Sequence, residues 1–299
     1  MSAKQELVTN ALEQVDKSLP FRFLWTVAHL VGVEAAIESL PDDGSIAEFC
    51  QAMIAGFNIE PVSKLPEWSS NTAGPGVLVY GPHRFHLEPY ILISLLQGRQ
   101  IYFVAMNSAR QLLPYDFRDR VLPVTPTFLG KDARKKPGLS GIVQSVKQSL
   151  FNNEDLTVHQ IKQSNQQTVN RAAELLIGGN IVAIFPTASN PITTTDWYAG
   201  LGSIVDTLES NGNADVLLQP FSIKEFRFMT FLQQMSIKFA LEQFRDPIPV
   251  HVDWFPTMSI DQAVGAGDMS PRGIVDKLRT EYLWESLLLR REQKFGDNE

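Results

Sequence analysis

Cysteine is almost absent from this chain. Cys50 is the single cysteine among 299 residues. One thiol can neither close a disulfide within the chain nor build a cysteine zinc site, which excludes disulfide-stapled folds and zinc fingers. We interpret Cys50 as a buried structural thiol. A reducing compartment is consistent with this composition, and we expect the protein to be cytoplasmic.

Long apolar runs are also missing. No segment reaches the roughly 18 apolar residues that a membrane-spanning helix needs, and the polar N-terminus lacks the apolar core of a signal peptide. The nearest candidate, residues 21–33, is interrupted by Arg22 and His29. It is typical of a buried amphipathic helix, and a helix lying on a membrane surface is the open alternative. We therefore expect a soluble chain or one with a peripheral membrane contact.

An excess of positive charge is lacking as well. Lys+Arg number 26 against Asp+Glu 33, for a net charge of −7. Nucleic acid is therefore not expected as a partner, because phosphate contacts need clustered cations. Hydrophobic residues at 44% and charged residues at 20% are typical of a globular protein long enough to bury a large core.

The sequence predicts two regions with a boundary near residue 65. Residues 1–65 predict a small N-terminal helical region, and residues 61–76, rich in proline and glycine, predict a linker. From residue 77 short β-rich runs alternate with helical ones, which predicts that residues 66–299 form an α/β domain with a mixed, mostly parallel central sheet flanked by helices. The expected strands are 77–80, 101–105, 121–125, 181–185, 216–221 and 249–254, and the expected helices are 89–97, 139–151, 164–177, 200–209, 226–244 and one from Ser270.

A histidine and a carboxylate follow the first of these strands. His83 comes just after Gly81-Pro82, and Glu88 stands directly before Pro89. Histidine is the natural general base near neutral pH, and a carboxylate can orient its ring and stabilise the imidazolium. Pro89 favours a helix start, so a turn carrying His83 can fold back toward Glu88. The sequence therefore predicts that this pair meets.

A second stretch gives the pair a context. The strand at 181–185 runs into Pro186-Thr187-Ala188-Ser189-Asn190, and residues 197–202 follow. Together with the histidine segment, and with Pro220 in a later apolar strand, this resembles the glycerolipid acyltransferase superfamily. Its members carry a histidine shortly before an aspartate, then a strand ending Phe-Pro followed by Glu-Gly-Thr-Arg, and then a Phe-Lys-x-Gly-like segment. The resemblance covers roughly residues 75–225.

The resemblance implies an acyltransferase of lipid metabolism. His83 would be the base and Glu88, in place of the aspartate, its partner. A fatty acyl group would pass from acyl-CoA or acyl-carrier protein, as co-substrate, to the hydroxyl of a glycerolipid-type or other alcohol, as in phospholipid biosynthesis, without a cofactor or metal. The residues that would bind substrate are Arg84, Phe85, His86, Pro186, Thr187, Ala188, Ser189, Asn190 and Gly200, with Lys131 and Arg134 as substitute cations.

The chain departs from the family at its phosphate-binding loop. Thr187 to Asn190 replace Glu-Gly-Thr-Arg, and Tyr198 stands at the lysine of Phe-Lys. An uncharged amide cannot make the bidentate contact of arginine with phosphate. One hypothesis is therefore that the enzyme uses an unphosphorylated acceptor. The alternative is that the protein is a catalytically degenerate relative that binds an acyl chain or a protein partner.

A metal site is a third hypothesis. His83, His86 and Glu88 could join His251 and Asp253 from a later strand around zinc or iron. The spacing of the two histidines at 83 and 86 suits neither a helix face nor an alternating strand. The aromatic segment 226–244 is a further open question, since it is explained either by core packing or as the wall of an acyl-chain tunnel.

Overall fold

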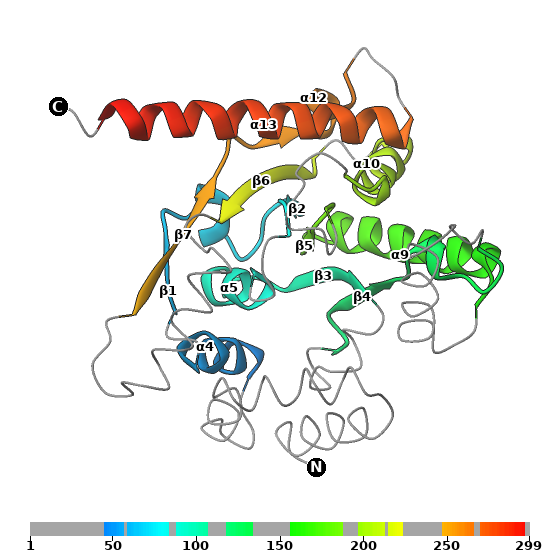
Figure 1. The fold of residues 1–299 in the computed structure, drawn as a ribbon, viewed down its shortest axis with the longest axis horizontal. Helices are drawn as coiled ribbons and strands as arrows, with labels where there is room; N and C mark the ends of the chain where they lie inside the picture. The colour runs from blue at the N-terminus through cyan, green and yellow to red at the C-terminus, as the bar shows by residue number, and fades with distance from the viewer. Residues whose placement is uncertain are drawn as a thin grey trace, which may run out of the picture. The chain divides into compact units, whose positions relative to one another are not determined.

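The structure is a computed structural model that describes residues 45–56, 59–83, 88–106, 118–133, 156–187, 197–212, 215–223, 247–265 and 270–296. The chain divides into two compact units, which we describe one at a time. Figure 1 labels their helices and strands. Unit 1 comprises residues 1–57 and 102–171, and unit 2 comprises residues 58–101 and 172–299. The candidate site lies in unit 2.

Unit 2 contains a mixed, mostly parallel sheet. Its strands are hydrogen-bonded in the order β1-β7-β6-β2-β5, and β8 pairs with β6. The β1–β7, β6–β2 and β2–β5 pairs are parallel, whereas β6–β7 and β6–β8 are antiparallel. The strands are β1 (Ile59–Ser63), β2 (Val77–Tyr80), β5 (Ile181–Ile184), β6 (Leu217–Ile223), β7 (Ile248–Trp254) and β8 (Met258–Ser259).

The central strand β2 is fully buried. All four of its residues, Val77 to Tyr80, are 0% exposed, as expected for a strand covered on both faces of a parallel sheet. Gly76 precedes it, and a Cβ built there would lie 1.9 Å from the carbonyl oxygen of Leu176. Only glycine therefore lets the chain enter β2 so close to the last turn of α9 (Val158–Ile177).

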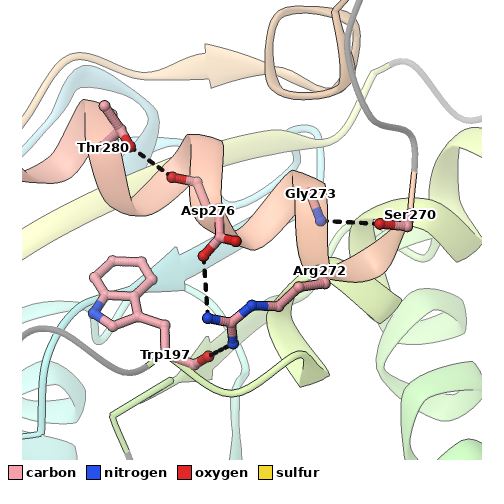
Figure 2. Close-up of polar contacts among 6 residues, drawn as sticks. All are labelled: Trp197, Ser270, Arg272, Gly273, Asp276 and Thr280. Carbon is pink, nitrogen blue, oxygen red and sulfur yellow. Dashed lines mark hydrogen bonds and ion pairs between the residues drawn. The ribbon is translucent and has the colours of Figure 1, made fainter.

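Helices alternate with these strands. They are α5 (Glu88–Leu95), α10 (Gly200–Ser210), α12 (Ile260–Val264) and α13 (Pro271–Gly296), with a 3₁₀ turn at Glu67–Ser70. The backbone N–H of Gly273 donates to Ser270 Oγ at 3.1 Å, so the serine cap and proline start predicted for the last helix are confirmed (Figure 2). Helices α10 and α12 pack against α13.

Unit 1 holds α4 (Ile46–Gly56), the strand β3 (Ile101–Met106) from its second residue on, the strand β4 (Val121–Val124), which pairs parallel with β3, and a 3₁₀ turn at Thr127–Leu129. Cys50 lies on α4 and is 0% exposed, as expected from the sequence. The helix α9 (Val158–Ile177) begins in unit 1 and ends in unit 2. Its last turn runs into Gly178-Gly179, where Gly179 has a φ of 79°, which confirms the predicted stop signal.

The coarse fold prediction is confirmed. Each of the six predicted strands is present within two residues of its predicted ends, and described helices lie between β2 and β3, between β4 and β5, and between β5 and β6. Two predictions were wrong. The expected linker at 61–76 contains the end of β1, where Pro61 is tolerated because β1 is the first strand of the order and has one neighbour, β7. Helix α9 begins at Val158 rather than 164, because Thr157 and Gln160 form reciprocal capping hydrogen bonds.

Other predictions fall outside the described residues. These are the helices expected before residue 45, at 139–151 and at 226–244. The boundary proposed at residue 65 between a helical region and an α/β domain stays a prediction.

Candidate active site

Three parallel strands bring the candidate site together. Tyr80, the last residue of β2, pairs with Ile184 of β5 and with Pro220 of β6. The chain after β2, the chain after β5 and the following residue of β6 therefore meet at one edge of the sheet. The carboxyl ends of parallel strands are where α/β sheets bind their ligands.

The predicted histidine–carboxylate pair meets at this edge. His83 Nδ1 lies 2.7 Å from a carboxylate oxygen of Glu88. Glu88 is the first residue of α5 and its side chain is 1% exposed, while the His83 side chain is 22% exposed. A buried carboxylate on Nδ1 holds the ring in the tautomer whose other nitrogen, Nε2, can accept a proton.

Thr187 fixes the backbone of the histidine. The backbone N–H of His83 donates to Thr187 Oγ1 at 2.7 Å, between residues 104 positions apart in sequence. Thr187 is 1% exposed. This hydrogen bond joins the segment after β5 to the turn after β2, so the Phe-Pro-Thr segment lies directly beside the candidate base.

Aromatic rings line the site on the side of the histidine ring. The ring of His83 packs against Phe185 at a centroid distance of 5.1 Å, and Phe185 packs edge-on against Phe221 at 6.0 Å. A Cβ built on Gly81 would lie 2.5 Å from the carbonyl oxygen of Phe221. Glycine at 81 therefore allows the turn that carries His83 to pass close to β6. The sequence did not single out Phe185 or Phe221 as site residues. Their signal is that Phe185 follows Ile184 and Phe221 follows Pro220, the two residues that pair with Tyr80 at the end of β2.

A buried amide holds the strand that precedes this aromatic group. Gln219 is 0% exposed and accepts hydrogen bonds from Trp68 Nε1 at 2.9 Å and Thr257 Oγ1 at 2.8 Å. It donates to the carbonyl oxygen of Phe255 at 2.6 Å. A satisfied buried amide of this kind fixes the position of β6 against two other segments.

A second aromatic cluster begins at Tyr80. Its ring meets Trp197 at 5.9 Å, and Trp197 meets Tyr282 of α13 at 5.4 Å. Burial raises the pKa of the Tyr80 hydroxyl. Arg272 of α13 donates to the carbonyl oxygen of Trp197 at 2.8 Å and pairs with Asp276 at 3.3 Å (Figure 2). This contact ties α13 to the segment that leads into α10.

The remaining predicted site residues divide into three groups. Pro186 is buried, and its carbonyl oxygen accepts the backbone N–H of Tyr198 at 2.8 Å. Gly200 is the first residue of α10. Lys131 belongs to unit 1, and its position relative to His83 is therefore not assigned. Outside the described residues lie Arg84, Phe85, His86, Ala188, Ser189, Asn190 and Arg134.

The predicted metal ligands do not form a cluster in the described part of the chain. His251 and Asp253 lie on β7, opposite Val62 of β1 and Ser222 of β6. Within the described residues, no three His, Cys, Asp or Glu side chains are grouped so as to hold a metal ion. The helices that the structure describes also include none with the length and apolar character of a membrane span.

The chain matches no protein-family model and none of the curated proteins with which it was compared. The acyltransferase resemblance thus stays a prediction from the motifs.

Proposed function

We propose that this protein is an O-acyltransferase that moves a fatty acyl group from a thioester donor to an alcohol. The observation that carries the proposal is the 2.7 Å contact between His83 Nδ1 and the buried Glu88 carboxylate. A histidine oriented in this way, partly exposed at the carboxyl edge of an α/β sheet, is a general base positioned to meet a substrate. The order of motifs in the sequence supports acyl transfer over other reactions of such a base.

The reaction needs two proton transfers, one from the acceptor hydroxyl to His83 and one from His83 to the departing thiolate. His83 Nε2 takes the proton from the acceptor hydroxyl as its oxygen attacks the thioester carbonyl. The new carbon–oxygen bond forms, the carbon–sulfur bond breaks, and the proton passes to the departing thiolate to give ester and free thiol. Glu88 stabilises the imidazolium between these two steps. Backbone N–H groups near residues 186–190 or at the start of α5 would stabilise the oxyanion.

The surroundings of His83 favour an acceptor without a phosphate close to the reacting hydroxyl. The residue that the Phe-Pro strand places beside His83 is Thr187, where the family carries glutamate, and Asn190 stands at the family's arginine. Phe185 presents an aromatic ring to the histidine. These neighbours offer apolar contact and a neutral hydroxyl, which suit a fatty alcohol or the unphosphorylated hydroxyl of a lipid.

The test is thiol release from acyl-CoA and acyl-carrier-protein donors across phosphorylated and unphosphorylated alcohols. Wild type is compared with His83→Ala and with His159→Ala, a matched variant of an exposed histidine on α9. We expect acceptor-dependent release with wild type and His159→Ala, and none above background with His83→Ala.

Two results would count against the proposal. The first is acceptor-dependent release that is equal in wild type and His83→Ala. The second is no release with any pair while the folded wild type retains acyl-CoA or a lipid on gel filtration. The second result would support the degenerate, ligand-binding relative instead.

A further inference from the structure

The segment that leads into α10 is tied to the backbone of the candidate base. The backbone N–H of Tyr198 donates to the carbonyl oxygen of Pro186 at 2.8 Å. Thr187, the residue after Pro186, accepts the backbone N–H of His83 at 2.7 Å. Trp197 directly precedes Tyr198, so a shift of Trp197 reaches the histidine through these two hydrogen bonds.

The side chain of Trp197 makes a second connection to the same turn. Its indole ring is 1% exposed and meets the ring of Tyr80 at a centroid distance of 5.9 Å. Tyr80 ends β2, shortly before His83. The indole also meets Tyr282 of α13 at 5.4 Å, and Tyr282 packs against Phe255 at 5.3 Å. Close-packed rings have little freedom to shift, so the position of Trp197 bears on the turn that carries the candidate base.

One side chain of α13 holds the backbone of Trp197. Arg272 Nη1 donates to the carbonyl oxygen of Trp197 at 2.8 Å, and Arg272 Nη2 pairs with Asp276 at 3.3 Å (Figure 2). Ile274 and Val275 are buried, so the first turns of α13 give the guanidinium a fixed base. The Arg272 and Asp276 side chains are 54% and 45% exposed. Because an exposed ion pair contributes little to global stability, the main consequence of this arrangement is the hold on Trp197.

We propose that Arg272 is a positioning residue for the candidate base, His83. It acts through Trp197 on the hydrogen bond that Thr187 accepts from the histidine backbone. The proposal rests on the proposed function, in which His83 is the base. Without Arg272, the carbonyl of Trp197 loses its donor on α13, and Thr187 holds the histidine less firmly. A displacement of about 1 Å can lower a rate about 100-fold, so even a partial loss of position is measurable.

The first experiment is amide hydrogen exchange, which needs no substrate. Labelling histidine with ¹⁵N gives at most five backbone amide signals, because the chain has five histidines, and His83→Ala identifies the signal of His83. Arg272→Met keeps an unbranched side chain without a donor. Lys277→Met is the matched control, because Lys277 of α13 also donates to a backbone carbonyl oxygen, that of Gln262. We expect the His83 amide to exchange about tenfold faster in Arg272→Met, and at the wild-type rate in Lys277→Met.

Three comparisons separate positioning from a general loss of stability. The midpoint of unfolding in urea should be the same in Arg272→Met and Lys277→Met. In a Thr187→Ala background, Arg272→Met should accelerate exchange no further, since the hydrogen bond through which it acts is gone. With the best donor and acceptor, Arg272→Met should lower kcat about 2- to 10-fold and leave KM unchanged.

Three results would overturn the proposal. They are exchange of the His83 amide at the wild-type rate in Arg272→Met, equal acceleration in Lys277→Met, and a change in KM alone. Faster exchange in Arg272→Met only, together with no acyl transfer by wild type, would support the positioning contact and count against the proposed function. The two proposals can therefore fail separately.

Discussion

Glu88 offers the sharpest test of how the candidate base is held. Replacing it by aspartate, the residue that the glycerolipid acyltransferases carry after their histidine, shortens the side chain by one carbon–carbon bond of about 1.5 Å. Helix α5 cannot move toward His83 to compensate, because Ile91 and Leu92 are buried beneath it. The 2.7 Å contact would lengthen to as much as about 4 Å, which is outside hydrogen-bond range.

The expected cost follows from the bond that is lost. A hydrogen bond to a charged group contributes about 1.5–3 kcal/mol, so Glu88→Asp should lower kcat/KM by about 10- to 150-fold. Glu88→Gln keeps the length and the acceptor oxygen but loses the charge. A neutral hydrogen bond still contributes about 1 kcal/mol. This variant therefore loses about 0.5–2 kcal/mol, and its kcat/KM should fall only about 2- to 30-fold. Glutamine should therefore be the better replacement of the two.

The assay is thiol release with the best donor and acceptor pair, and the free energy of unfolding in urea serves as the readout that needs no substrate. A double-mutant cycle of His83→Ala and Glu88→Gln should give a coupling of about 1 kcal/mol or more. Aspartate activity equal to or above that of wild type, or a coupling near zero, would refute the argument that the 2.7 Å contact positions the base.

Three further predictions concern other contacts. Thr187→Ala should lower kcat by about 2- to 10-fold with little change in KM, because one hydrogen bond to the His83 backbone is lost. Thr187→Ser keeps the hydroxyl and should restore kcat. A change in KM alone would instead indicate a role in substrate binding. Gly76→Ala should destabilise the fold by about 3 kcal/mol or more in urea, because its Cβ would lie 1.9 Å from a carbonyl oxygen, whereas Gly98→Ala, with its nearest atom at 3.4 Å, should change little. Burial raises the pKa of the Cys50 thiol, so the native thiol should resist thiol reagents. The unfolded thiol ionises near pH 8.5, so the free energy of unfolding should fall as pH rises past that value, and Cys50→Ala should remove this slope.

The sequence predicted the sheet because short runs rich in apolar and β-branched residues, such as Val77–Tyr80, favour strands over helices. It also predicted that His83 and Glu88 meet, since Pro89 marks a helix start that places the carboxylate beside the turn. Both predictions rest on residues that are close together in the sequence, and the folded protein keeps the local conformation that these residues favour.

Two of the three features that were missed depend on partners distant in the sequence, and the start of α9 depends on a local pair. β1 contains Pro61, and its parallel pairing with β7 supplies the reason for its extended chain. The start of α9 is set by Thr157 and Gln160, a capping pair without an apolar repeat to announce it. The contact of Thr187 with His83 spans 104 positions, and no local pattern could reveal its geometry.

The position of β2 in the sheet has a consequence for synthesis. Both of its neighbours, β5 and β6, are more than 100 residues further along the chain, at Ile181–Ile184 and Leu217–Ile223. At typical translation rates, Val77 to Tyr80 wait on the order of 10 s before a native partner strand has been made. An uncharged apolar strand with both edges open is a strong site for aggregation. The nascent chain should therefore depend on chaperone binding to residues 77–80 until β5 has emerged from the ribosome.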